Sequence, residues 1–93
     1  MENFWKKVEK VNDLADVFKA LSHPIRVQLI AGLIEKDECN VTNMVKNLNV
    51  AQPTISQHIN VLKTLGIVKG YRKGNQIYYK LDNDLVRKIY RVL

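Results

Sequence analysis

The feature that most constrains the fold of this chain is a change in the spacing of its apolar residues at Gly66. Before Gly66, apolar residues recur every three or four positions, which is typical of amphipathic helices. After it, in residues 67–73 and 76–81, apolar and polar residues alternate, which is typical of strands. Gly74-Asn75 lies between these two segments and is a two-residue hairpin signal. The chain is therefore expected to fold as helices followed by one β-hairpin.

Five helices are expected around this hairpin, at residues 4–21, 24–34, 41–48, 52–65 and 85–93. Pro24 and Pro53 fall in the first turns of two of them, where proline is tolerated, and Gly66 stops the fourth. Residues 35–40 are expected to form a polar connection. The predicted fold class is mainly α with a small β-hairpin, in the order α-α-α-α-β-β-α. A length of 93 residues predicts a single domain, 1–93.

Polar side chains at the starts of these helices are candidate caps, because their oxygens accept hydrogen bonds from the first free N–H groups. Ser22 or His23 lies near the cap of the second helix, and Asn40 or Thr42 is able to cap the third. The last helix follows residues 82–84, an Asp-Asn-Asp run that is expected to cap it.

The net charge of +6 is confined to the C-terminal part of the chain. Residues 1–50 carry seven basic and seven acidic side chains, whereas residues 51–93 carry eight basic and two acidic ones. Segregated positive charge is the footprint of a nucleic-acid binder, although a solvated Lys-rich face has the same composition.

A membrane partner is not expected, since no apolar run approaches the roughly 20 residues of a membrane span. A cytoplasmic location is expected, since residues 1–7 lack the order of a signal peptide and the single Cys39 fits a reducing compartment.

The helices at 41–48 and 52–65, joined by a short turn, have the form of a helix-turn-helix unit. The second helix of such a unit enters the major groove of DNA. Residues 51–62 carry no formal charge, and their polar side chains are amides and hydroxyls of the kind that bind base edges. The alternative is a polar helix surface with no role in DNA binding. The candidate DNA-binding residues of this helix are Gln52, Pro53, Thr54, Ser56, Gln57, His58, Asn60 and Lys63.

The hairpin adds a second candidate surface, because a cationic β-ribbon can contact phosphates or enter a minor groove. Its candidate DNA-binding residues are Arg72, Lys73, Asn75 and Gln76. The alternative is an ordinary hairpin whose lysines keep its edge soluble. Beside a helix-turn-helix unit the hairpin is interpreted as a wing, so the expected architecture is a winged helix-turn-helix. Alternation places Ile77, Tyr79 and Leu81 on the face that is expected to pack on the core.

Three segments of the chain resemble the ArsR/SmtB family of repressors. LSHPIRVQLI at 21–30 resembles an early signature of that family, and LNVAQPTISQHINVLKTLGIV at 48–68 resembles its recognition segment. YYKL at 78–81 resembles the end of its wing. Together these segments cover almost the whole chain. One departure is Ala51, where the family usually has a capping serine, so the cap of the fourth helix is expected to be weak or to come from elsewhere.

The resemblance implies a homodimer, built from the first and last helices, that binds an inverted-repeat operator in double-stranded DNA. A repressor would act sterically, by occupying a promoter until its DNA affinity falls. The expected dimer-interface residues supply more apolar surface than one small core can cover, and they are Trp5, Val8, Phe18, Ile89, Tyr90 and Leu93. A protein-interaction module that does not bind duplex DNA is the alternative from another functional class.

Neither common metal site of the family is expected in this chain, and no cofactor is expected. The usual Cys-x-Cys pair aligns with Asn40-Val41-Thr42, and the last helix contains no His and no Glu. Cys39 is the one candidate redox sensor, although Asp37 and Glu38 are expected to oppose formation of its thiolate; the alternative is an inert small residue. His23 is expected at a helix start, and His58 in helix packing or near DNA. No nucleophile–base constellation stands out, so an enzyme is not expected.

Overall fold

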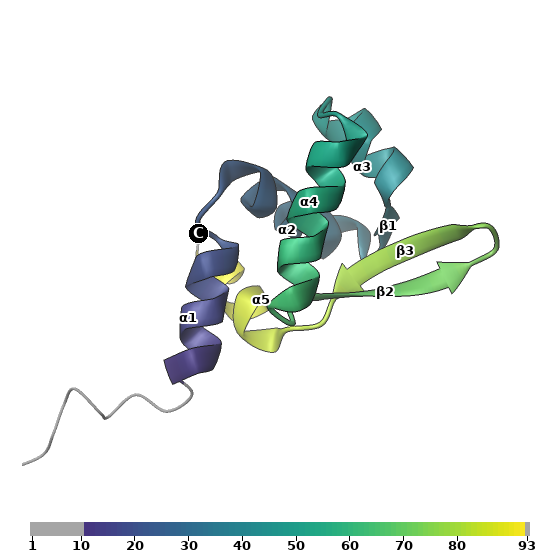
Figure 1. Ribbon diagram of the computed structural model, residues 1–93. Coiled ribbons are helices and arrows are strands. Elements are labelled where there is room, and N and C mark those ends of the chain that lie inside the picture. Colours follow the sequence, from purple (N-terminus) through teal and green to yellow (C-terminus); the bar gives the residue numbers. More distant parts are fainter. Residues whose placement is uncertain (1–10, 93) are drawn as a thin grey trace, which may run out of the picture.

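The computed structural model describes residues 11–92, and its elements follow the expected order with one short strand added (Figure 1). The elements are α1 (Val11–Ala20), α2 (Pro24–Lys36), β1 (Cys39–Asn40), α3 (Val41–Leu48), α4 (Gln52–Thr64), β2 (Val68–Lys73), β3 (Gln76–Leu81) and α5 (Asp84–Arg91). Residues 4–10 of the helix expected at 4–21 lie outside the described residues. The mainly α fold with a β-hairpin is confirmed.

Side-chain caps define the starts of three helices. The His23 Nδ1 atom accepts a hydrogen bond from the Ile25 N–H at 3.1 Å, so the cap of α2 is His23 and not Ser22. Asn40 caps α3 through the Asn43 N–H at 2.9 Å, so the cap is not Thr42. Asn83, within the expected run, caps α5. Ala51 provides no side-chain cap for α4, as the sequence predicts.

The three strands form one antiparallel sheet in the order β1-β3-β2. The prediction of a polar connection over residues 35–40 was wrong at both of its ends. α2 continues to Lys36, and Cys39 and Asn40 pair with Tyr79 and Tyr78 of β3. A two-residue strand is too short to show an alternating pattern, so only its pairing with β3 reveals it.

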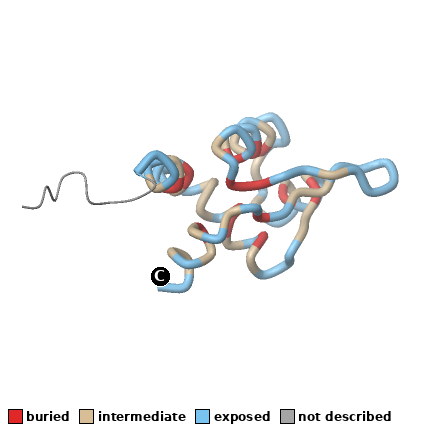
Figure 2. The backbone as a smooth tube through the Cα atoms, turned by 90° about the horizontal axis from the view of Figure 1, so that it is seen from below, coloured by how far each residue is buried: buried red, intermediate tan, exposed pale blue. Residues whose placement is uncertain are grey.

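The core lies where the helices meet the base of the β2–β3 hairpin, and Figure 2 shows the exposed tip of that hairpin extending away from it. Its buried apolar residues come from nearly every element and are Val17, Ala20, Leu29, Ile30, Leu33, Met44, Ile55, Ile59, Leu62, Ile67, Val68, Leu81 and Val86. Within residues 11–92 no single helix is long and apolar enough to span a membrane, and α1 and α2, which pass that test only together, are bent by 101° at their junction.

The expectation that Ile77 packs on the core was wrong. Leu81 is buried and Tyr79 is half-buried, but Ile77 is 46% exposed. All three lie on one face of β3, and Ile77 is the one nearest the tip, where it pairs with the exposed Arg72. Alternation along a strand predicts which side chains share a face, but not how far along the strand the core extends.

Candidate nucleic-acid interface

The α4 helix has one buried apolar face and one exposed polar face. Ile55, Ile59 and Leu62 are at most 1% exposed, and their packing fixes the rotation of the helix about its axis. No charged side chain occurs between Ala51 and Leu62. Of the candidate DNA-binding residues on this helix, Gln52, Pro53, Gln57, Asn60 and Lys63 are exposed, and Thr54, Ser56 and His58 are half-buried.

A short turn between α3 and α4 sets the direction in which α4 leaves the core. Asn49 has a left-handed backbone with φ 54°, which Asn tolerates better than most residues. Its N–H donates to the Val45 carbonyl at 2.8 Å and ends α3. The Ala51 carbonyl then accepts from the N–H groups of Thr54 and Ile55 at 3.1 Å each, which begins α4. The two helices form a helix-turn-helix unit.

The β2–β3 hairpin, called the wing from here on, also has two different faces. On the core side, the Val68–Leu81 pair is buried and Gly70 pairs with Tyr79. A Cβ atom at Gly70 would lie 2.9 Å from the Tyr79 ring, so glycine makes room for that ring to lie against the strand. The core side is therefore closely packed at the base of the wing.

Tyrosines and lysines alternate on the other face of the wing. The Tyr71 and Tyr78 rings are stacked with their centroids 6.3 Å apart. The Lys73 ammonium lies 5.1 Å from the Tyr78 centroid, and the Lys80 ammonium lies 5.9 Å from that of Tyr71. These cation–π contacts hold positive charge along the wing surface.

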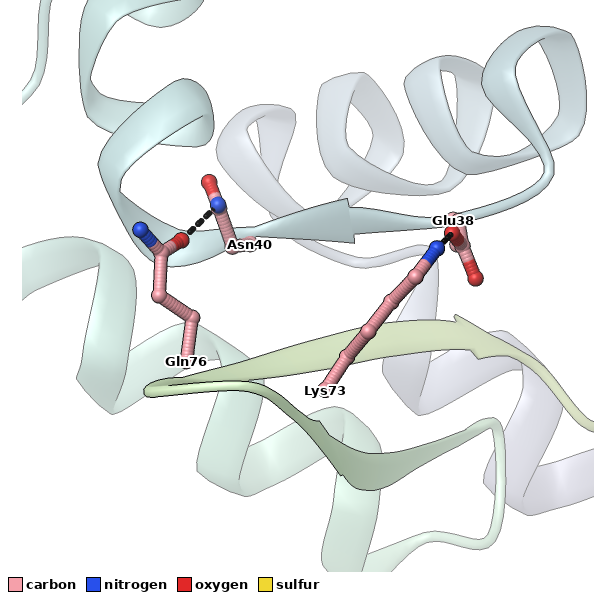
Figure 3. A network of polar contacts seen from close by, with 4 residues as sticks. All are labelled: Glu38, Asn40, Lys73 and Gln76. Carbon is pink, nitrogen blue, oxygen red and sulfur yellow. Dashed lines mark hydrogen bonds and ion pairs between the residues drawn. The ribbon is translucent and has the colours of Figure 1, made fainter.

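Two candidate DNA-binding residues of the wing are bonded to the segment around β1 (Figure 3). The Lys73 ammonium donates to the Glu38 carboxylate at 2.6 Å, which raises the pKa of Lys73 above its ordinary value. The Asn40 side-chain amide donates to the Gln76 side-chain oxygen. Because Asn40 is only 6% exposed and also caps α3, it joins the wing to the first helix of the helix-turn-helix unit. Arg72 and Asn75 are exposed near the tip.

His58 lies at the flank of α4 that faces the junction of α1 and α2. Its ring centroid is 4.2 Å from that of His23, and its Nδ1 atom is 3.1 Å from the Arg26 Nη1 atom. Burial lowers the pKa of His58 from 6.5, and the nearby His23 and Arg26 lower it further. The sequence correctly predicts His23 at a helix start and His58 in helix packing. It contains no local signal that Arg26 would contact His58.

Cys39 is half-buried in β1, and its thiol donates to the Asn40 carbonyl at 3.4 Å. Burial raises the pKa of this thiol from 9.0, so the thiolate is disfavoured. The reason expected from the sequence was wrong, because the side-chain charge that acts on the thiol is that of Lys36, which lowers its pKa. In the part of the chain that the structure describes, no three His, Cys, Asp or Glu residues gather where they could hold a metal ion. A redox role for Cys39 stays a prediction.

Residues 23–69, which contain α2, the helix-turn-helix unit and the start of the wing, match the model of the bacterial regulatory protein, arsR family. The chain belongs to the arsR family. A curated relative, an HTH-type transcriptional regulator of Methanocaldococcus jannaschii, is 35% identical over 92% of this chain and 97% of its own length. Members of this family are transcriptional regulators, so this chain is a DNA-binding regulator and not an enzyme. The alternative of a module that does not bind DNA is thereby disfavoured.

Two solved structures share the fold of this arsR-family chain. The transcriptional repressor PagR of Bacillus anthracis is 31% identical, with a TM-score of 0.80 over 87% of this chain and 92% of PagR. A homodimeric winged helix-turn-helix DNA-binding domain from Mycobacterium bovis is 26% identical, with a TM-score of 0.78 over 87% of this chain and 74% of that one. The winged helix-turn-helix architecture is confirmed.

The expected dimer-interface residues of this arsR-family chain lie only partly within the described residues. Phe18 on α1 is 58% exposed, and Ile89 and Tyr90 on α5 are half-buried. Trp5, Val8 and Leu93 lie outside the described residues. α1 packs against α5 within the protomer, so Phe18, Ile89 and Tyr90 belong to two neighbouring helices (Figure 1).

Proposed function

We propose that this chain is a homodimeric repressor that binds an inverted-repeat operator in double-stranded DNA. The observation that carries the proposal is the pairing of an uncharged polar face on α4 with a cationic wing beside it. Amide and hydroxyl groups form directional hydrogen bonds with base edges, whereas cations bind every phosphate alike. We therefore assign recognition of the DNA sequence to α4. A large share of the binding affinity is assigned to the wing.

The base contacts are assigned to α4, with Gln57 and Asn60 foremost because both are exposed and uncharged. Gln and Asn pair with the N6 and N7 groups of adenine in the major groove. Gln52, Pro53, Thr54 and Ser56 belong to the first turns of the helix, which face bases or the phosphates that flank them in helix-turn-helix proteins. Lys63 in the last turn is assigned to a phosphate.

The wing contacts are assigned to Arg72 and Asn75 first, because the structure leaves both exposed near the tip. Lys73 and Gln76 are also proposed to face DNA. In the free protein, however, Lys73 is bonded to Glu38 and Gln76 is bonded to Asn40. Wing cations neutralise phosphates and release counterions, so their contribution falls as salt rises.

Dimerisation is proposed to place two α4 helices about one DNA turn apart, roughly 34 Å, which matches the two halves of an inverted repeat. The homodimeric Mycobacterium bovis domain supports this arrangement. A dimer on a promoter would exclude polymerase until its affinity falls. A cytoplasmic location is part of this proposal, because the family is one of bacterial regulatory proteins and a bacterial chromosome lies in the cytoplasm.

The test compares Gln57→Ala and Arg72→Ala on two duplexes: one that the wild type selects from a random library, and one of random sequence. Gln57→Ala is expected to cost about 1–3 kcal/mol on the selected duplex and little on the random one. Arg72→Ala is expected to weaken binding to both and to reduce the salt slope by about one.

Gln28→Ala and Lys36→Ala are the matched controls, since both side chains are exposed on α2, which lies outside the proposed DNA and dimer interfaces. Neither control should change the affinity for either duplex. The assignment of base contacts to α4 is wrong if Gln57→Ala weakens binding to both duplexes equally.

A further inference from the structure

The Arg26 side chain on α2 joins the end of α1 to the middle of α4. Its Nε atom donates to the Ala20 carbonyl at 3.1 Å, and its Nη2 atom donates to the Lys19 carbonyl and the Ser22 hydroxyl at 3.0 Å each. Its Nη1 atom is 3.1 Å from the Nδ1 atom of His58. We call these four contacts the Arg26 clamp.

The chemistry of the clamp requires arginine. The last carbonyls of a helix have no partners within the helix, and here two of those at the end of α1 accept from one guanidinium. A guanidinium offers donors in a rigid planar fork, whereas the lysine ammonium is a single point on a flexible stem. Lysine at position 26 would keep the charge but could not hold α1 and α4 together in the same geometry.

The clamp also determines the protonation state of His58. An arginine side chain has donors only, so the Nδ1 atom of His58 must be the acceptor and its proton must lie on Nε2. A doubly protonated imidazolium has no acceptor and would lose this bond. The ionisable groups that act on His58 are Arg26 and His23, on α2 and at its cap, and both oppose a positive charge there. α4 itself adds no charged side chain between Ala51 and Leu62.

We propose that Arg26 is a positioning residue for DNA recognition, which holds α4 in its DNA-binding orientation through the neutral, Nε2-protonated form of His58. The proposal rests on the proposed function, because it takes α4 as the helix that binds the operator. Arg26 itself need not contact DNA. Acidification then weakens binding, since protonated His58 is repelled by Arg26 and releases α4 from the end of α1. A histidine that only contacted phosphate would have the opposite effect, because its protonation would strengthen binding.

The first test is the affinity for the duplex that the wild type selects from a random library, measured from about pH 7.5 to about pH 5. The wild type is expected to bind about tenfold more weakly at the lower pH, the loss expected for one charge-assisted hydrogen bond. His58→Asn keeps an acceptor near the Nδ1 position and cannot be protonated. It should bind within about twofold of the wild type at the higher pH and lack this acid-dependent loss. His58→Leu and Arg26→Lys should bind about tenfold more weakly throughout.

His23→Asn is the matched control for the second histidine, because asparagine can still cap α2. This variant should keep the acid-dependent loss and shift it to higher pH, since the His23 ring helps to lower the pKa of His58. The double variant Arg26→Lys/His58→Leu should bind no more weakly than either single variant, because both substitutions break the same contact.

The second test needs no DNA. Nitrogen-15 shifts of the His58 ring should show an unprotonated Nδ1 and a protonated Nε2 in the free protein, and Arg26→Lys should raise the pKa of His58 in a variant that remains folded. The proposal is overturned if His58→Asn binds as weakly as His58→Leu, or if acid strengthens wild-type binding. Failure of the wild type to select any duplex would instead overturn the proposed function, while the ring shifts would still report on the clamp.

Discussion

At the scale of single residues, one carboxylate is paired with a wing lysine that is proposed to contact DNA. Glu38 bonds to Lys73 at 2.6 Å from the segment just before β1. Both side chains are solvent-accessible, so the pair is screened by salt and adds little to stability. Under the proposed function its main effect is on DNA binding, because Lys73 would have to exchange this partner for a phosphate.

Glu38→Gln is expected to strengthen binding to random duplex DNA by several-fold. The substitution removes the competing carboxylate, and one more neutralised phosphate steepens the salt slope by about 0.9. The measurement is affinity for random duplex DNA as a function of salt concentration. Glu35→Gln, an exposed position at the end of α2, removes the same charge away from Lys73. Equal effects of the two substitutions would contradict a specific role for the Glu38–Lys73 pair.

At the scale of elements, α4 differs from α2, α3 and α5 in starting without a side-chain cap. His23, Asn40 and Asn83 cap the other three helices, whereas Ala51 has no acceptor to offer. Pro53 reduces the number of N–H groups in the first turn that need a hydrogen-bond acceptor, because proline has no N–H group. The start of α4 is therefore held by the backbone bonds to the Ala51 carbonyl and by the packing of Ile55 on the core.

Ala51→Ser is expected to raise the free energy of unfolding by about 1 kcal/mol. The serine hydroxyl can accept a hydrogen bond from the Thr54 N–H, which is the normal partner of such a cap and which now donates only to the Ala51 carbonyl at 3.1 Å. Denaturant unfolding at fixed protein concentration measures the change, since the stability of a dimer depends on concentration. Ala15→Ser, at an exposed position inside α1, is the control and should not stabilise the protein. A gain in stability no larger than that of Ala15→Ser would show that the first N–H groups of α4 already have adequate hydrogen-bond partners.

At the scale of the whole molecule, α1 has more apolar surface than the rest of residues 11–92 covers. Val17 and Ala20 are fully buried against the core, yet Val11 and Phe18 on the same helix are 53% and 58% exposed. Val92, just after the neighbouring α5, is 82% exposed. A second copy of the chain that packs on α1 and α5 would cover this surface, which is the dimer proposed above.

Phe18→Lys is expected to convert the dimer into a monomer at micromolar concentration. A two-fold interface loses both copies of the aromatic side chain and gains two charges, and aromatic residues contribute strongly to such interfaces. Analytical ultracentrifugation without DNA measures the change. Ile77→Lys alters another exposed apolar residue, on the wing, and should leave the dimer intact. A wild type that is monomeric at this concentration, or dissociation caused by Ile77→Lys, would contradict the proposed interface.

The order of the helices and of the two hairpin strands could be predicted from the sequence alone, because it follows from interactions between near neighbours in the chain. The spacing of apolar residues, the prolines and the capping residues act within a few positions of one another. The same local patterns sufficed to recognise the helix-turn-helix unit and the family. They also placed Gln57 on α4 and Arg72 on the wing.

Only the tertiary structure decided how these elements are joined. β1 exists because Cys39 and Asn40 meet the edge of β3, and Ile77 is exposed because the core ends before the wing tip. Arg26 reaches His58 across 32 positions, and Lys73 reaches Glu38 across 35. Contacts over such separations depend on how the helices pack and which side chains then share a surface. No local pattern contains that information, because the partners become neighbours only when the chain has folded.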